Sequence, residues 1–206
     1  GVVSGVLGIR WFDCSVTGME AHAGPTPMAL RKDAMLAATR IMQDVVAAAH
    51  RHPPHGRGTV GMVQVFPNSR NVIPGRVKFS IDLRNSTDAL VDAMAAEVKA
   101  FTDQVAKEHG VQVHIEMVSS YPAQLFQPEC VEAVGRAAAK LGYSHMPAVS
   151  GAGHDAVYMA KLAPSGMIFI PCKDGISHNE IEDAKPEHIE AGCNVLLHAM
   201  LERAGT

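Results

Sequence analysis

The chain has 206 residues, of which 47% are hydrophobic and 19% are charged, and its formal net charge is −3 at pH 7. This composition supports a packed core and argues against disorder, and the length allows one large domain or two small ones. The weakly negative charge gives no reason to expect a nucleic acid or an anionic membrane as a partner. No apolar run approaches the roughly 18 residues of a membrane span and no signal segment is visible, so we expect a cytoplasmic protein.

The first part of the chain alternates between strand and helix patterns in the order β-α-β-β-α-β. In its clearest strand, Val77, Phe79, Ile81 and Leu83 point to one face and polar residues to the other. This order is typical of the split βαβ arrangement, in which two helices cover one face of a four-stranded antiparallel sheet. We therefore expect an α+β domain over residues 9–120. The predicted strands are 6–17, 59–66, 76–84 and 111–119, and the predicted helices are 33–50 and 86–109.

The pattern changes after Tyr121-Pro122, and residues 121–206 contain one clear strand among helices. A single strand exposes both of its edges, so we expect these residues to complete a sheet built by residues outside this chain. Residues 1–8 read as a strand already in progress with no initiator Met, and we expect them to end another segment of that domain or to form a hinge. The predicted elements are helices over 129–141, 155–159 and 186–201 and a buried strand over 165–171.

A polar loop, Gly175-Ile-Ser-His178-Asn-Glu180, follows the predicted buried strand. Open α/β sheets bind ligands outside the carboxyl ends of their strands. His178 can therefore offer an imidazole nitrogen to a metal or a substrate, with Glu180 orienting it. The other reading is an ordinary solvated loop histidine.

The turn Ser150-Gly-Ala-Gly-His-Asp155 is rich in glycine but lacks the GxGxxG spacing and the GKS/T ending of nucleotide-binding loops. Its glycines would still let backbone N–H groups approach a carboxylate or an oxyanion at a helix N-terminus. His154 would either donate a hydrogen bond to such a ligand or only cap the helix.

Three further polar residues lie in turns or at strand ends. His22, between turn residues, would stabilise an oxyanion if it faces a site, or else be an exposed loop histidine. Arg84 would clamp a carboxylate through two guanidinium nitrogens, or pair with Asp82 on a solvated face. Asn71 precedes a Pro-Gly turn and would serve that turn or a ligand.

Taken together, five motifs resemble the amidase, hydantoinase and carbamoylase branch of the M20 metallopeptidase-like family. This branch includes N-carbamoyl-L-amino acid hydrolases, β-ureidopropionases and allantoate amidohydrolases. The resemblance covers essentially the whole chain, and the motifs occur in the family's order. They are Ala21-His-Ala-Gly24-x-Thr-Pro-Met28, Asn71-Val-Ile-Pro74, Asp82-x-Arg84, the Ser150–Asp155 turn and Gly175-Ile-Ser-His178-x-Glu180.

The resemblance implies a hydrolase of N-carbamoyl or related ureido acids with two divalent metal ions, Zn or Mn, or else Co or Ni. In such an enzyme the metals lower the pKa of a bridging water and a glutamate acts as base, so that the C–N bond is hydrolysed. The fold implied is an α/β catalytic domain, whose C-terminal part would be residues 121–206. Residues 9–120 would be an inserted lid domain through which the enzyme forms a homodimer.

The same resemblance implies a role for each candidate residue. His178 would be a metal ligand, and His22 would stabilise the tetrahedral oxyanion in the active site of the partner subunit. The substrate's carboxylate end would be held by Asn71 and Arg84, and its pocket would be lined by Gly153 and His154.

The resemblance also implies metal ligands and a catalytic glutamate that this sequence does not contain. One histidine cannot hold a dinuclear site, because each ion needs three or more protein ligands. We therefore expect the chain to be the C-terminal half of such an enzyme, inactive without the N-terminal half. Two alternatives are a non-catalytic dimerisation or ligand-binding module, and a peptidase or aminoacylase of the same superfamily.

Overall fold

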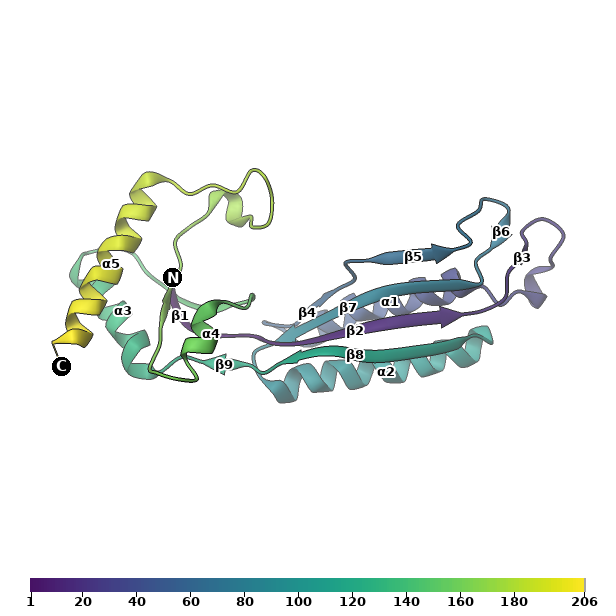
Figure 1. The fold of residues 1–206 in the computed structure, drawn as a ribbon, viewed down its shortest axis with the longest axis horizontal. Coiled ribbons are helices and arrows are strands. Elements are labelled where there is room, and N and C mark those ends of the chain that lie inside the picture. The colour runs from purple at the N-terminus through teal and green to yellow at the C-terminus, as the bar shows by residue number, and fades with distance from the viewer. Residues whose placement is uncertain (206) are drawn as a thin grey trace. The chain divides into compact units, whose positions relative to one another are not determined.

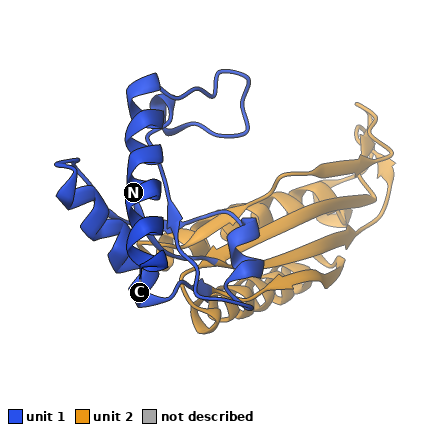
Figure 2. Cartoon of the chain, turned by 60° about the vertical axis from the view of Figure 1, so that its left-hand side comes forward, with its two compact units in different colours: residues 1–7, 124–206 blue, residues 8–123 orange. Residues whose placement is uncertain are grey.

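The computed structural model describes residues 1–205, which divide into two compact units (Figures 1 and 2). Unit 1 contains Gly1–Leu7 and the residues from Gln124 onward, and unit 2 contains Gly8–Ala123. The chain therefore passes from one unit to the other twice. Within the described residues, no helix is both long and apolar enough to span a membrane.

Unit 2 is built on an antiparallel sheet with the strand order β4-β7-β2-β8, in which β5 also pairs with β7. Its two central strands, β2 and β7, pair without a register break from Gly8↔Asn85 to Thr17↔Arg76. Residues paired across such a ladder point to the same face of the sheet. The strands are β2 (Gly8–Thr17), β4 (Arg57–Thr59), β5 (Val63–Phe66), β7 (Arg76–Asn85) and β8 (Gln112–Tyr121).

Two long helices, α1 (Ala34–Arg51) and α2 (Asp88–His109), pack on one face of this sheet (Figure 1). The predicted helix start at residue 33 is confirmed, because Oδ1 of Asp33 accepts hydrogen bonds from two backbone N–H groups of the first turn, at 2.9 and 3.1 Å. The predicted stop of the second helix is also confirmed, since Gly110 adopts a left-handed backbone conformation with φ 61°.

The core of unit 2 confirms the predicted alternation in β7. Val77, Phe79, Ile81 and Leu83 are all at most 1% exposed and pack with apolar residues of both helices and of β2. Full burial of a side chain of this size is worth about 1.5–3 kcal/mol, so this stripe stabilises the unit strongly. The opposite face of β7 presents its polar residues, among them Arg84.

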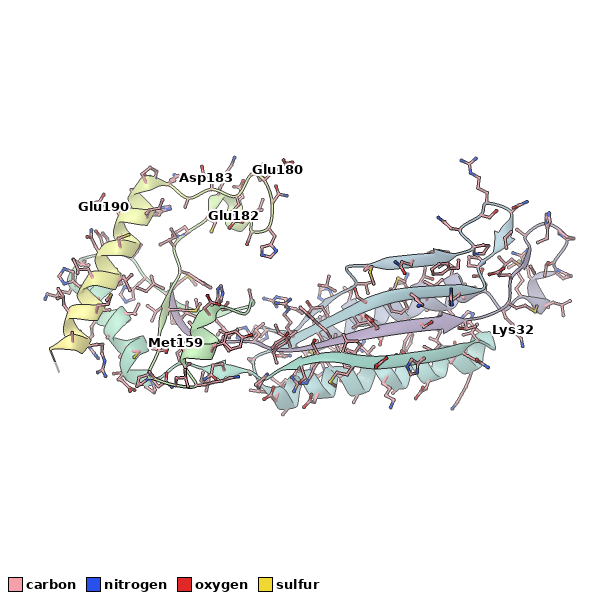
Figure 3. All side chains as sticks on the ribbon, in the orientation of Figure 1. Lys32, Met159, Glu180, Glu182, Asp183 and Glu190 are labelled. Carbon is pink, nitrogen blue, oxygen red and sulfur yellow. The ribbon has the colours of Figure 1, made fainter. Side chains whose placement is uncertain are left out.

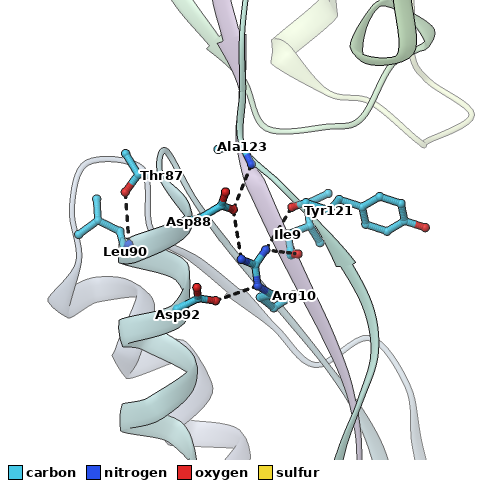
Figure 4. A network of polar contacts seen from close by, with 8 residues as sticks. All are labelled: Ile9, Arg10, Thr87, Asp88, Leu90, Asp92, Tyr121 and Ala123. Carbon is cyan, nitrogen blue, oxygen red and sulfur yellow. Dashed lines mark hydrogen bonds and ion pairs between the residues drawn. The ribbon is translucent and has the colours of Figure 1, made fainter. Parts of the chain in front are cut away.

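A buried arginine fastens the end of unit 2 at which both connections to unit 1 leave (Figure 4). Arg10 donates hydrogen bonds to Asp92 at 2.8 Å, to Asp88 at 3.1 Å and to the carbonyl groups of Ile9 and Tyr121. Asp88 also accepts a hydrogen bond from the backbone N–H of Ala123 at 3.2 Å. One ion-pair cluster thus ties the start of β2, the end of β8 and the first turn of α2.

Two predicted strands of this region are wrong in extent. Residues 59–66 do not form one strand, because the ladder to β7 breaks between β4 and β5 around Gly61, as glycine in a strand often allows. Residues 6–17 are also split, because Leu7 separates β1 (Val2–Val6) of unit 1 from β2 of unit 2.

Unit 1 contains a small sheet with the order β10-β1-β11, in which β9 also pairs with β1. The expectation of a single strand in residues 121–206 is therefore wrong, because three short strands of this segment pair with β1 of the same chain. Residues 2–6 supply the central strand, and β10 (Pro147–Ser150) is a parallel strand too short to show a periodicity. The other strands are β9 (Gln124–Leu125) and β11 (Met167–Ile168), so the predicted strand 165–171 is much shorter than expected.

Two helices of unit 1, α3 (Pro128–Lys140) and α5 (Pro186–Ala204), pack against each other with proline at the first helical position of each. The apolar pattern of α5 predicts a core side of Ile189, Val195, Leu196 and Met200, which is only partly correct. Val195 and Ala199 are buried, whereas Leu196 is 50% exposed and Met200 is 61% exposed. The helix thus carries a second apolar stripe that the described residues do not cover.

The remaining elements are short. They are β3 (Ala21–His22), β6 (Val72–Ile73), α4 (Asp155–Met159) and the 3₁₀ turns η1 (Met28–Leu30) and η2 (Lys173–Gly175).

Candidate functional site

His22 and Asn71 lie side by side on a short two-stranded ribbon in unit 2. His22 pairs with Val72 between β3 and β6, and the backbone N–H of Ala23 donates to the carbonyl oxygen of Asn71 at 2.8 Å. The sequence places these residues far apart, and the fold brings their backbones together. Asn71 also serves its own turn, because its side-chain oxygen accepts a hydrogen bond from Ser69 at 2.9 Å.

The hydrogen bonds of His22 fix which ring nitrogen carries the proton. Its Nδ1 accepts a hydrogen bond from the backbone N–H of Gly24 at 3.0 Å. The neutral ring must therefore bear its proton on Nε2, which leaves an N–H donor on an exposed side chain. A fixed donor of this kind is what stabilisation of an oxyanion requires.

Arg31 holds the turn that carries His22, a role that the sequence does not reveal. Its guanidinium donates to the carbonyl oxygens of Ala23 at 2.7 Å and of Thr26 at 3.0 and 3.1 Å. The hydroxyl of Thr26 in turn donates to the carbonyl of His22 at 2.7 Å. No local pattern marks Arg31, because its partners lie five and eight residues earlier in an irregular turn.

Arg84 lies at the other end of the unit 2 sheet from His22. It grips Asp82 through two nitrogens, with Nε–Oδ1 at 2.9 Å and Nη2–Oδ2 at 2.6 Å, and this hydrogen bonding raises the pKa of the guanidinium. The ribbon with His22 joins the sheet at Arg76, eight residues along β7, so about 27 Å of strand at roughly 3.4 Å per residue lies between them. One copy of unit 2 does not bring Arg84 together with His22 and Asn71.

In unit 1, Gly153 and His154 lie on the Gly-rich turn that leads from β10 into α4. His154 is the N-terminal cap residue of α4, but its side chain makes no cap hydrogen bond to the helix. It instead contacts the hydroxyl of Ser150, with Nε2–Oγ at 2.9 Å, and stands edge-on to Phe169 with ring centroids 5.6 Å apart. No side chain fills the space that a Cβ on Gly153 would take, which leaves its backbone accessible.

His178 lies on an exposed loop of unit 1 that is closed by a backbone hydrogen bond from Lys173 to Asp183 at 2.7 Å. Its backbone is left-handed, with φ 58°, an uncommon conformation for a residue other than glycine. The orienting role expected of Glu180 stays a prediction, because no hydrogen bond between Glu180 and His178 is found among the described residues. Glu180 and Glu182 lie on the same loop (Figure 3), and the carboxylate of Glu182 accepts a hydrogen bond from the backbone N–H of His178 at 2.9 Å, which holds the loop and not the imidazole ring.

The donor set around His178 does not fit the metal pair that the motifs imply. Among residues 1–205, no three or more His, Cys, Asp or Glu side chains are grouped so that they could hold a metal ion. Each ion of such a pair needs three or more protein ligands. The described part of this chain therefore does not supply the ligand set of either ion by itself.

Comparison with known proteins places this fold and these motifs in a family. Residues 13–202 match the model for peptidase family M20/M25/M40. The chain is 47% identical over 99% of its length to an N-carbamoyl-L-amino-acid amidohydrolase of Rhizobium meliloti, of which it covers 49%. It is 30% identical to an allantoate amidohydrolase of Bacillus subtilis, again over 99% of its own length and 50% of the relative.

Solved structures agree with the sequence matches. The chain superposes on an amidase of the hydantoinase/carbamoylase family from Burkholderia multivorans with a TM-score of 0.96 and 53% identity, over 99% of this chain and 50% of that one. This chain thus spans about half the length of the curated relatives that it matches. Since the family model matches nearly the whole sequence, the chain belongs to peptidase family M20/M25/M40.

Proposed function

We propose that this chain is part of a metal-dependent amidohydrolase that cleaves the C–N bond of N-carbamoyl amino acids or related ureido acids. The observation that carries the proposal is the 47% identity to an N-carbamoyl-L-amino-acid amidohydrolase over 99% of the chain. The proposed role of His22 at the oxyanion is supported by its fixed Nε2–H donor.

Unit 2 is proposed to be a split βαβ lid and dimerisation domain. The separation of Arg84 from His22 and Asn71 supports this role. About 27 Å of strand prevents all three residues of one copy from contacting one substrate, whereas two copies related by a two-fold axis, with their sheets running in opposite directions, would allow it. In this arrangement His22 of one copy would reach the oxyanion, and Asn71 of that copy together with Arg84 of the other would hold the carboxylate end.

Unit 1 is proposed to be the C-terminal part of the catalytic domain, which the other half of the enzyme completes. An apolar cavity of about 770 Å³ lies between α3, β11 and α5, and Leu196 and Met200 line it. These two side chains are at least half exposed, and an exposed apolar patch of this kind marks an interaction surface. We propose that this surface packs against the half of the enzyme that the relatives contain and this chain does not.

The chain alone is proposed to lack activity, because His178 would be its single metal ligand. The test is hydrolysis of N-carbamoyl-L-amino acids, measured as released amino acid, by the chain with Zn or Mn ions. No turnover is expected from the chain alone, whereas turnover should appear after addition of a separately produced N-terminal half of the Rhizobium meliloti relative. Robust hydrolysis by the chain alone would refute the proposal that its metal site is incomplete.

A His178→Ala variant provides the matched control for this experiment. It should still bind the added half, as measured by size-exclusion chromatography, but should give no turnover. If the wild-type chain and the added half associate but turn over no ureido acid, then the alternative of a non-catalytic dimerisation or ligand-binding module is favoured. Turnover of dipeptides or N-acyl amino acids in preference to ureido acids would favour the peptidase or aminoacylase alternative.

A further inference from the structure

Ser150, the last residue of β10, is a buried polar residue to which neither the motif comparison nor the proposed function gives a role. Ser150 is only 1% exposed, and its hydroxyl oxygen lies within hydrogen-bonding distance of three polar atoms. The oxygen is 2.8 Å from the carbonyl oxygen of Ala152, 3.2 Å from the backbone nitrogen of Ala152 and 2.9 Å from Nε2 of His154.

The single proton of this hydroxyl decides the state of His154. Serine offers one O–H donor and two acceptor lone pairs. If the proton pointed to Nε2, the hydroxyl and carbonyl oxygens would face each other at 2.8 Å with no proton between them. If it points to the Ala152 carbonyl, Ser150 Oγ accepts from both the Ala152 N–H and the Nε2–H of His154, and every group is satisfied.

This arrangement leaves the other nitrogen of His154 as an acceptor. A neutral imidazole with its proton on Nε2 has a lone pair on Nδ1. No described residue donates a hydrogen bond to Nδ1, and the edge-on contact with Phe169 limits rotation of the ring. The ring is thus held by two neighbours while the lone pair of Nδ1 is available to a ligand.

We propose that Ser150 is a positioning residue that holds His154 as the Nε2–H tautomer, so that Nδ1 accepts a hydrogen bond from a ligand. The ligand group recognised here is then an N–H or O–H donor and not a carboxylate or an oxyanion, either of which would need a donor. Under the proposed function, on which the identity of the ligand rests, the donor is a ureido N–H of the substrate. This replaces the expectation that His154 donates to the ligand.

The tautomer can be measured on the isolated chain without any activity. In a long-range ¹H–¹⁵N correlation spectrum at alkaline pH, where free imidazole is neutral, Nε2 of His154 should resonate as a protonated ring nitrogen and Nδ1 as an unprotonated one. A His154→Gln variant identifies the signals by their loss. The opposite pattern, with the proton on Nδ1, would overturn the proposal, whatever the enzyme's substrate proves to be.

Substitution of the serine tests its positioning role. In Ser150→Ala, exchange of the His154 Nε2 proton with water should become at least tenfold faster, because its acceptor is lost. Ser165→Ala is the matched control, since that exposed hydroxyl also donates to a carbonyl, at 3.0 Å, but contacts no histidine. Equal exchange rates in wild type and Ser150→Ala would refute the role of Ser150. Should Ser150→Ala fail to fold, the wild-type spectrum still decides the tautomer.

A third measurement concerns the ligand and uses the chain complemented with the N-terminal half. An asparagine amide oxygen can replace Nδ1 as acceptor, whereas glutamine reproduces the position of Nε2. His154→Asn should therefore keep at least tenfold more kcat/KM than His154→Gln. If His154→Gln is the more active of the two, Nδ1 is not the atom that contacts substrate, although the tautomer assignment could still hold on the spectrum alone.

Discussion

Replacement of Arg10 by methionine should destabilise unit 2 through the loss of four hydrogen bonds at one buried point (Figure 4). Methionine keeps most of the aliphatic stem, so the change isolates the guanidinium. The side chain of Arg10 is 8% exposed, but its partners Asp88 and Asp92 are 46% and 58% exposed and can be hydrated again. The two ion pairs are therefore worth only about 0.5 kcal/mol each.

The larger part of the loss comes from the backbone. The carbonyl groups of Ile9 and Tyr121 lose a charged donor, at about 1 kcal/mol each after their partial return to water. The variant no longer has the desolvation cost of a buried guanidinium charge, and this offsets part of the lost stability. We expect the free energy of unfolding of unit 2 to fall by about 2 kcal/mol, with Asp92→Asn costing about 0.5 kcal/mol.

Urea unfolding monitored by tryptophan fluorescence measures this change, because the single tryptophan, Trp11, lies in β2 next to Arg10. Arg40→Met is the matched control in the same unit, since Arg40 is 36% exposed and its ion pair with Glu108 lies at the surface. The control should unfold close to wild type. If Arg10→Met and Arg40→Met unfold at the same urea concentration, then the buried cluster contributes no more than a surface ion pair and the reasoning is wrong.

Three further predictions concern other parts of the chain. Burial raises the pKa of the Cys14 thiol to about 12, so a thiol reagent should label the exposed Cys172 quickly and Cys14 only after unfolding; comparable native rates would contradict this. Gly18→Ala should cost about 1–3 kcal/mol, because the new Cβ would lie 1.9 Å from a backbone carbonyl oxygen, whereas Gly61→Ala meets nothing closer than 3.9 Å. Hydrogen bonds from His52 and Arg51 lower the pKa of Glu97 below its ordinary value of 4.5. The carboxylate therefore stabilises the folded state above pH 4.5, and this stabilisation is lost as the pH falls through the pKa of the folded state. Glu97→Gln should remove this part of the pH dependence of the urea unfolding midpoint.

The fold of unit 2 could be predicted where local pattern and tertiary packing agree. The alternation in β7, the cap at Asp33 and the stop at Gly110 each follow from rules that act over a few residues, and each is present. The sheet of unit 1 could not be predicted. Pro147–Ser150 is too short to show a period, and its pairing with residues 2–6 joins segments about 145 positions apart in sequence.

The candidate site could be predicted as a set of residues but not as an arrangement. The motifs identify His22, Asn71 and Arg84, yet only the register of β7 shows that Arg84 is far from the other two. The role of Ser150 also depends on three distances around one oxygen atom. Spacing along the sequence cannot supply such distances, because the turn between Ser150 and His154 has no regular geometry.

Because the ladder between β2 and β7 is unbroken, its register alone decides which face of the sheet carries the side chain of Arg84. Side chains alternate along a strand, so a slip of β7 by one residue would exchange its two faces. The side chains of Phe79 and Ile81 would then be exposed to solvent, and the Asp82–Arg84 ion pair would be buried against the helices. An insertion that shifts the register of β7 by one residue would therefore bury the arginine and expose the core together.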